Sequence, residues 1–123
     1  MKLFADLAVS FVAFLELSFL ILEIFFWESS YSLRAFKLSP ELAKETTRFA
    51  ANIGLYNGFL VAGLVWGLLF GDEGFLIKVF FLCCVVVAGI FGGVTVNRSI
   101  ILFQGVPAAL ALLLVVLARQ NGF

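Results

Sequence analysis

Residues 14–27 read FLELSFLILEIFFW, an apolar run that is interrupted by two glutamates. The run is part of a longer apolar segment, from about Leu3 to Trp27, and a helix needs roughly 20 mostly apolar residues to cross a bilayer. An ionised acid inside a bilayer is costly, so Glu16 and Glu23 must each be paired, hydrated or protonated. The stretch therefore predicts a membrane-spanning helix and marks the two side chains at which a function should be sought.

The composition of the whole chain also indicates a membrane protein. Of its 123 residues, 63% are hydrophobic and 13% are charged, whereas a soluble domain is about 45–50% apolar and about 25% charged. A water-soluble core of this size cannot hide so much apolar surface. The net charge is zero and the eight basic residues are scattered, so we expect membrane lipids rather than nucleic acid as partners.

Four apolar segments are long enough to span a bilayer, and their continuous, non-alternating pattern predicts helices. They cover about residues 3–27, 49–70, 75–96 and 100–118. Ser39-Pro40-Glu41 is typical of a helix start, so the second of these helices should begin near residue 40 and project from the membrane. We therefore expect an all-α fold in which residues 1–123 form one polytopic membrane domain, a four-transmembrane-helix bundle.

Basic residues predict the orientation of this bundle, because cytoplasmic connections carry an excess of lysine and arginine. One side of the membrane would hold Arg34, Lys37, Lys44, Arg48 and Arg98, and the other would hold Lys2, Lys78 and Arg119. The first side should face the cytoplasm. We therefore expect residues 28–48 to form a cytoplasmic loop and both termini to lie outside.

Small residues form two ridges along the second span, and such ridges let helix backbones approach closely. Gly54 and Gly58 belong to one ridge, and Gly63 and Gly67 belong to the other. One interpretation assigns one ridge to the bundle and the other to a homo-oligomer. Packing within a single chain explains each ridge equally well. In the fourth span, Pro107 predicts a kink.

The two glutamates share one helix face, because a separation of seven residues places them within about 20° of each other. Glu16 lies nearest the middle of its span and is the better candidate for an acid that binds a proton. Glu23 should lie nearer the cytoplasmic interface. We expect a polar cluster toward the cytoplasm that contains Glu23, Arg48, Asn52 and Arg98. Deeper in the membrane we expect Glu16, Gln104 and either Tyr56 or Asn57.

Catalysis and metal binding receive little support from the sequence. The chain has no histidine, which is the usual general base near neutral pH and the commonest metal ligand. The adjacent cysteines, Cys83 and Cys84, lie in an apolar run and are interpreted as small hydrophobic residues. We therefore assign no catalytic residue, no metal site and no cofactor, and we lean against an enzyme.

Three stretches of the sequence resemble a known family in their order and spacing. Residues 51–68 read ANIGLYNGFLVAGLVWGL, residues 80–92 read FFLCCVVVAGIFG, and residues 104–114 read QGVPAALALLL. They resemble the bacterial domain-of-unknown-function family 1304, which consists of small integral membrane proteins with four predicted helices. The resemblance implies the topology and a bacterial inner-membrane location, but no activity. Leu17 and Ile53 replace a histidine and a glutamine of the family pattern, which weakens a catalytic interpretation.

Three functions fit these observations. We favour a proton- or small-molecule-binding bundle with the layout of a small transporter, in which a buried carboxylate alternates between a proton and a small lipophilic ligand. One alternative is a non-catalytic structural or interaction protein, in which the polar groups only link helices. The other is a membrane enzyme that acts on a lipophilic substrate.

Overall fold

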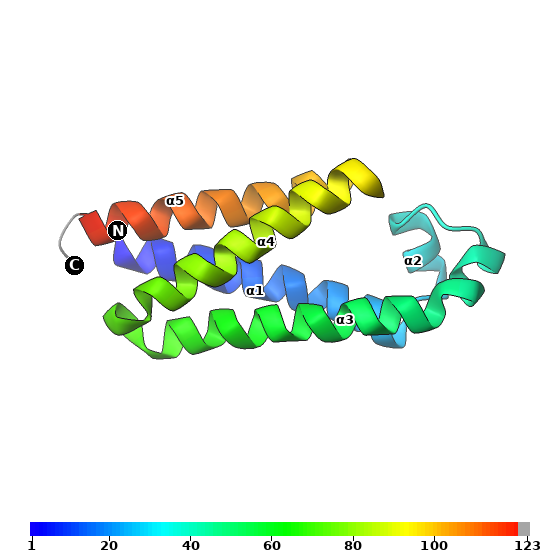
Figure 1. The fold of residues 1–123 in the computed structure, drawn as a ribbon, viewed down its shortest axis with the longest axis horizontal. Helices are drawn as coiled ribbons and strands as arrows, with labels where there is room; N and C mark the ends of the chain where they lie inside the picture. Colours follow the sequence, from blue (N-terminus) through cyan, green and yellow to red (C-terminus); the bar gives the residue numbers. More distant parts are fainter. Residues whose placement is uncertain (121–123) are drawn as a thin grey trace.

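The computed structural model describes residues 1–120, and Figure 1 shows them as an elongated bundle of helices. Residues 121–123, the last part of the predicted domain, lie outside the described residues. The chain forms α1 (Lys2–Phe25), α2 (Ser30–Ala35), α3 (Pro40–Leu69), the 3-10 helix η1 (Gly71–Gly74), α4 (Phe75–Thr95), the π-helix η2 (Ile101–Gly105) and α5 (Val106–Gln120).

The membrane-spanning architecture is confirmed. Within residues 1–120, four helical segments are long and apolar enough to cross a bilayer. They are Lys2–Phe25, Pro40–Leu69, Gly71–Thr95 and Ile101–Gln120. The described part of the chain contains no strand, so the fold is all-α and the protein is a multi-pass membrane protein.

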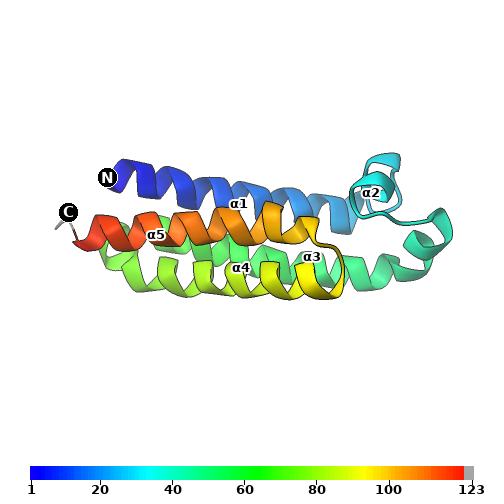
Figure 2. The ribbon, with the colours of Figure 1, turned by 90° about the horizontal axis from the view of Figure 1, so that it is seen from above.

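The four long helices run alternately up and down, and each packs against two neighbours. α1 contacts α3 and α5, and α4 contacts the same two helices. Figures 1 and 2 show the N terminus, the end of α5 and the η1 turn at one end of the bundle, which we call the terminal end. The short helix α2 and the link between α4 and η2 lie at the opposite end, which we call the α2 end.

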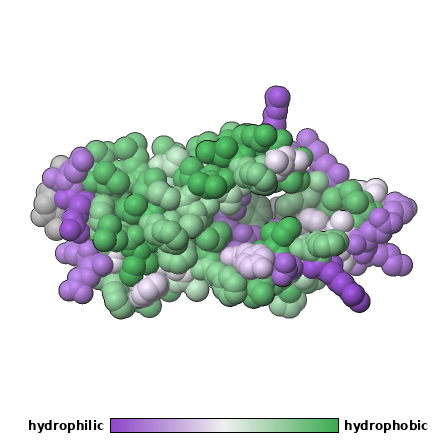
Figure 3. Space-filling view, in the orientation of Figure 1, coloured by the Kyte–Doolittle hydropathy of each residue, from purple (hydrophilic) through white to green (hydrophobic). Residues whose placement is uncertain are grey.

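Most buried positions along the long helices are three or four residues apart. On α1 this seam contains Val9, Val12 and Glu16, and on α4 it contains Leu82 and Val85. Such spacing is typical of left-handed bundles, in which neighbouring helices interdigitate along a narrow apolar stripe. The outward faces are also apolar, and Figure 3 shows them as a hydrophobic band between two hydrophilic ends. This band is the surface that would face lipid.

Both glycine ridges of α3 are used within the chain. A Cβ added at Gly54 would lie 2.7 Å from Cγ1 of Ile24 on α1, and one at Gly58 would lie 3.0 Å from Leu20. Gly63 and Gly67 instead approach Phe81 and Lys78 on α4. The close contacts therefore correspond to packing inside one chain, and a homo-oligomer through these glycines stays a prediction.

Local signals explain where α3 begins and ends. The Ser39 hydroxyl accepts a hydrogen bond of 3.1 Å from the Leu42 amide, and Pro40 occupies the first turn, where its missing N–H costs nothing. After the helix, Gly71 adopts a φ of 58°, which a residue with a side chain rarely tolerates. The second ridge therefore stops at Gly67, because Gly71 belongs to the turn.

A π-helical turn lies directly before α5, at the place where Pro107 predicts a kink. Such wide turns occur as isolated features within helices, often at functional sites. On its inner side the Gly105 backbone approaches Gly89 of α4 so closely that an added Cβ at Gly89 would overlap it. The turn therefore brings this segment, including Gln104, against the centre of the bundle.

Candidate functional site

The carboxyl group of Glu16 lies completely buried in the middle of the bundle. Its Oε1 accepts a hydrogen bond of 2.8 Å from Nε2 of Gln104, a residue of η2 that is also buried. Its Oε2 has no hydrogen-bond partner among residues 1–120. The structure therefore brings together Glu16 and Gln104, two of the residues that we expected deep in the membrane.

Glu23 forms a second pair of the same kind, two turns along α1. Its Oε1 accepts a hydrogen bond of 2.6 Å from Nδ2 of Asn57 on α3, and both residues are buried. Each glutamate thus meets a carboxamide from a neighbouring helix. Because hydrogen bonds to a carboxylate are stronger than those between neutral groups, each pair fixes the orientation of its acid.

The seams of the two helices explain why Asn57 faces Glu23. Asn57 follows Ala50 by seven residues and Gly54 by three, and all three are buried on the face that contacts α1. The absence of a side chain at Gly54 allows close approach, since an added Cβ there would lie 3.2 Å from Cβ of Glu23. The small residues therefore bring the asparagine within reach of the acid.

The predicted grouping of Glu23 with Arg48, Asn52 and Arg98 is wrong, because all three of these side chains are exposed. Asn52 lies about 200° around α3 from Gly54, on the face that turns away from α1. Tyr56 is 56% exposed and points to the same outer side, so of the two alternatives named for the deeper cluster only Asn57 is buried.

A cavity of about 410 Å³ adjoins the carboxyl–carboxamide pairs. Figure 3 shows a hollow with hydrophilic atoms in it on this face of the bundle. Glu23, Asn57 and Gln104 form the polar part of its wall, and Glu16 lies behind Gln104. The other lining residues are Phe19, Trp27, Phe36, Ile53, Ala88, Phe91, Gly92, Thr95, Val96 and Ile100.

A second cavity, of about 460 Å³, lies between α1, α2 and the segment around η2. It shares three wall residues, Phe19, Phe36 and Ile100, with the first cavity. Phe36 stands between aromatic neighbours, with its ring centroid 4.9 Å from that of Trp27 and 6.5 Å from that of Phe19. The two spaces are therefore neighbours across an aromatic wall. No pattern in residues 30–35 indicates that α2 forms part of this wall.

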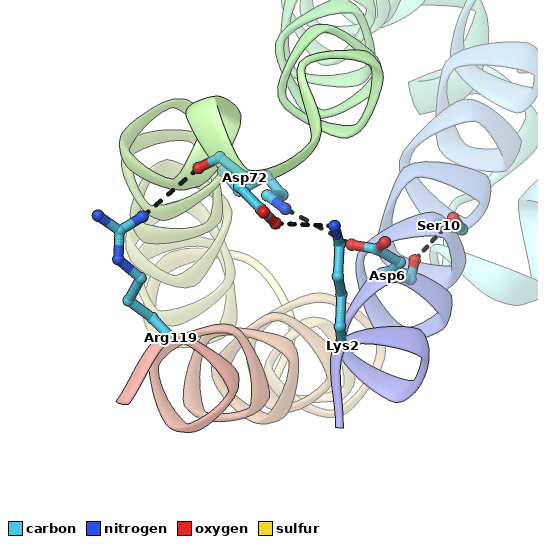
Figure 4. A network of polar contacts seen from close by, with 6 residues as sticks. Lys2, Asp6, Ser10, Asp72 and Arg119 are labelled. Carbon is cyan, nitrogen blue, oxygen red and sulfur yellow. Dashed lines mark hydrogen bonds and ion pairs between the residues drawn. The ribbon is translucent and has the colours of Figure 1, made fainter. Parts of the chain in front are cut away.

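A polar network that sequence reasoning missed closes the terminal end. Nζ of Lys78, a residue that is only 3% exposed, lies 3.5 Å from Oδ1 of Asp6. Figure 4 shows Asp72 between Lys2 and Arg119: Nζ of Lys2 lies 2.7 Å from its Oδ1, and Nη1 of Arg119 donates to its carbonyl oxygen at 3.4 Å. The signal that points to Lys78 is its spacing, four residues before Leu82 on the buried seam of α4.

The polar groups at and behind the cavity wall are two carboxyl groups and two carboxamides. The carboxyl groups can exchange protons, and all four groups can take part in hydrogen bonds. In the part of the chain that the structure describes, no three histidine, cysteine, aspartate or glutamate residues gather around one point.

Comparisons with known proteins identify relatives of this chain. The family described as "Protein of unknown function (DUF1304)" matches residues 10–116, which confirms the resemblance drawn from the sequence. The "Uncharacterized protein YpaA" of Lactococcus lactis subsp. lactis (strain IL1403) is 31% identical over 94 residues, which cover 75% of this chain and 79% of that protein. No solved structure matches. Neither description names an activity, so a function has to be argued from the site.

Proposed function

The chain belongs to the DUF1304 family, and from its two buried carboxyl–carboxamide pairs we propose that it binds a proton or a small molecule inside its bundle, in the manner of a small transporter. The observation that carries the proposal is the fully buried carboxyl of Glu16, whose Oε2 has no partner within residues 1–120. A purely structural acid would be expected to use both oxygens, since an unmade hydrogen bond in a buried site is costly.

The surroundings of the two acids support an exchange of partners. A carboxyl group in an apolar site is stable as the neutral acid or beside a cationic group. The carboxamides of Asn57 and Gln104 are neutral and suit either state, because an amide both donates and accepts hydrogen bonds. The adjoining cavity has the size of a small-ligand site, for which about 300–1,000 Å³ is usual. A proton and a ligand could therefore use the same acids in turn.

Infrared difference spectroscopy of the reconstituted protein tests the proton-binding part, because a protonated carboxyl absorbs separately from a carboxylate. The wild type should show a carboxyl band that changes with pH, and Glu16→Gln should remove it. Glu45→Gln is the matched control, since it removes an exposed acid at the α2 end and should leave the band unchanged. If the band persists when Glu16 and Glu23 are both replaced by glutamine, these acids bind no proton and this part of the proposal fails.

A structural role is the second candidate, and one observation favours it. Each hydrogen-bonded pair links two helices: Glu23 joins α1 to α3, and Glu16 joins α1 to η2. Interhelical hydrogen bonds of this kind hold membrane bundles together, typically with modest energies. The first candidate function requires the pairs for binding, whereas the structural role requires them for the stability of the bundle.

We further propose that the α2 end faces the cytoplasm of a bacterial cell, with both termini outside the inner membrane. The argument is the excess of basic residues at that end. They are Arg34, Lys37, Lys44, Arg48 and Arg98, against Lys2, Lys78 and Arg119 toward the terminal end. Reporter proteins fused at Gly71 and at the C terminus should both give periplasmic signals. Cytoplasmic signals at both positions would invert the orientation.

A further inference from the structure

We propose that the ligand of the cavity beside Glu23 is a lipophilic amine, with a protonated nitrogen at Glu23 and a single apolar chain. The inference rests on the proposed function in one respect, namely that this cavity is a binding site. It adds the charge of the ligand, the place of its head group and the path of its chain.

The charge follows from the residues that line the two cavities. Among the described residues in both walls, Glu23 is the only acid and there is no lysine or arginine. The buried Lys78 is directed to Asp6 at the terminal end and does not line either cavity. An anionic ligand would thus add a second negative group to a site without a cation, whereas an ammonium group would supply the cation that Glu23 lacks.

The polar part of the wall can bind an ammonium group, which carries up to three donors and no acceptor. The second carboxylate oxygen of Glu23 and the carboxamide oxygens of Asn57 and Gln104 are acceptors at one side of the cavity. Aromatic rings of Trp27, Phe36 and Phe91 form much of the remaining wall. Rings of this kind also attract an alkylammonium cation, most strongly where water is excluded.

The path of the chain follows from the second cavity. Its wall is mostly apolar, and it adjoins the first cavity through Phe19, Phe36 and Ile100. With the head group at Glu23, an alkyl chain would reach this apolar space by displacing the Phe36 ring, which lines both cavities. An apolar space of this kind suits a ligand with one long chain better than a small polar amine, which could not fill it.

Tryptophan fluorescence can report on this site. Trp27 lines the cavity, whereas Trp66 is half exposed on the outer face of α3. A Trp66→Phe variant therefore leaves Trp27 as the single indole. We would reconstitute this variant in phosphatidylcholine nanodiscs and titrate it with dodecylammonium, dodecanol and dodecanoate, which share one chain length and differ in head-group charge.

Dodecylammonium should give a saturable change in Trp27 fluorescence, and dodecanol and dodecanoate should bind roughly tenfold more weakly or not at all. In the same background, Glu23→Gln should weaken dodecylammonium binding roughly tenfold or more, as expected for a lost hydrogen bond to a charged group. Glu45→Gln removes the same charge from the exposed part of α3 and should change the affinity less than about twofold.

If Glu23→Gln does not fold, the comparison of the three head groups in the Trp66→Phe variant, which keeps Glu23, still tests the proposal. Equal binding of dodecanol and dodecylammonium would overturn the assignment of a cation while leaving a small-molecule site in place. Tighter binding of dodecanoate would overturn it as well. Loss of all binding in Glu45→Gln would place the cation elsewhere. If no probe gives a saturable change, the inference fails, and the infrared measurement on Glu16 then decides separately whether proton binding survives.

Discussion

The acidic side chains at the two ends of the bundle have different partners. At the terminal end, Asp6 and Asp72 meet the basic groups of Lys78 and Lys2 at 3.5 and 2.7 Å. Toward the α2 end, Glu16 and Glu23 meet only carboxamides, and cavities adjoin them. An acid beside a lysine already has its counter-charge. An acid beside an amide is oriented but keeps its capacity for a proton or a cation.

Two glycines, one toward each end, also differ in what surrounds them. At the terminal end, Gly74 contacts the carbonyl of Gly67 so closely that an added Cβ would overlap it. Toward the α2 end, Gly92 lines the cavity, and its added Cβ would meet only the Ile100 side chain, at 3.1 Å. An added methyl group would thus meet rigid backbone at Gly74, whereas at Gly92 it would meet a side chain that can move.

The largest effect should come from Gly74→Ala, which places a methyl group against a carbonyl that cannot move away. We expect the free energy of unfolding to fall by about 3 kcal/mol, the upper part of the usual range for overpacking. Gly92→Ala is the matched control and should cost less than about 1 kcal/mol, because a side chain can yield there. Reversible unfolding in mixed micelles measures both. Equal losses would remove the distinction between the two glycine positions.

A smaller loss should follow Asp6→Asn, which leaves the buried Lys78 ammonium without its counter-charge. We expect a decrease of about 2 kcal/mol in the free energy of unfolding, less than for a fully buried pair because Asp6 is partly exposed to water. Asp72→Asn alters an exposed pair and should have a much smaller effect that salt weakens further. A loss at Asp72 as large as that at Asp6 would show that burial of the cation is not the cause.

The smallest effect should come from Gln104→Leu, which removes the one hydrogen-bond donor of Glu16 among residues 1–120. The expected cost is about 1 kcal/mol, since the acid then has no partner at either oxygen. The double variant Glu16→Leu/Gln104→Leu should recover most of this loss, because replacing both partners by apolar groups is often nearly neutral. If the double variant is less stable than both the wild type and Gln104→Leu, the pair serves mainly to hold helices together. That result would support the structural role over ligand binding.

Most of the fold could be predicted from the sequence because its signals are local. Apolar length predicts the four spans, and Ser39 with Pro40 is a start signal at the residue where α3 begins. The short helix α2 was not predicted, since its six residues, SYSLRA, mix polar and apolar side chains without a clear periodicity. The π-helical turn was expected only as a kink, because Pro107 indicates a disturbed helix without specifying its form.

The site was predicted only in part because helix depth is easier to infer than helix rotation. Glu16 and Gln104 were expected at a similar depth, and they meet. Asn57 was named only as an alternative to Tyr56 in the deeper cluster, although its spacing from Ala50 and Gly54 indicates the inner seam of α3, and its partner is Glu23. The attraction of opposite charges favoured Arg48 and Arg98 as partners of Glu23. In the structure both arginines are exposed, so neither needs a buried acid as its partner.

The wide turn at Ile101–Gly105 also bears on how such a site could arise or be lost. A π-type hydrogen bond spans one residue more than an α-type bond, so the turn holds one surplus residue relative to a regular helix. Deleting that residue would let the segment become an ordinary helix while the flanking parts keep their directions. The carboxamide would then leave its inward position, and Glu16 would lose its partner without any change in the lipid-facing surface.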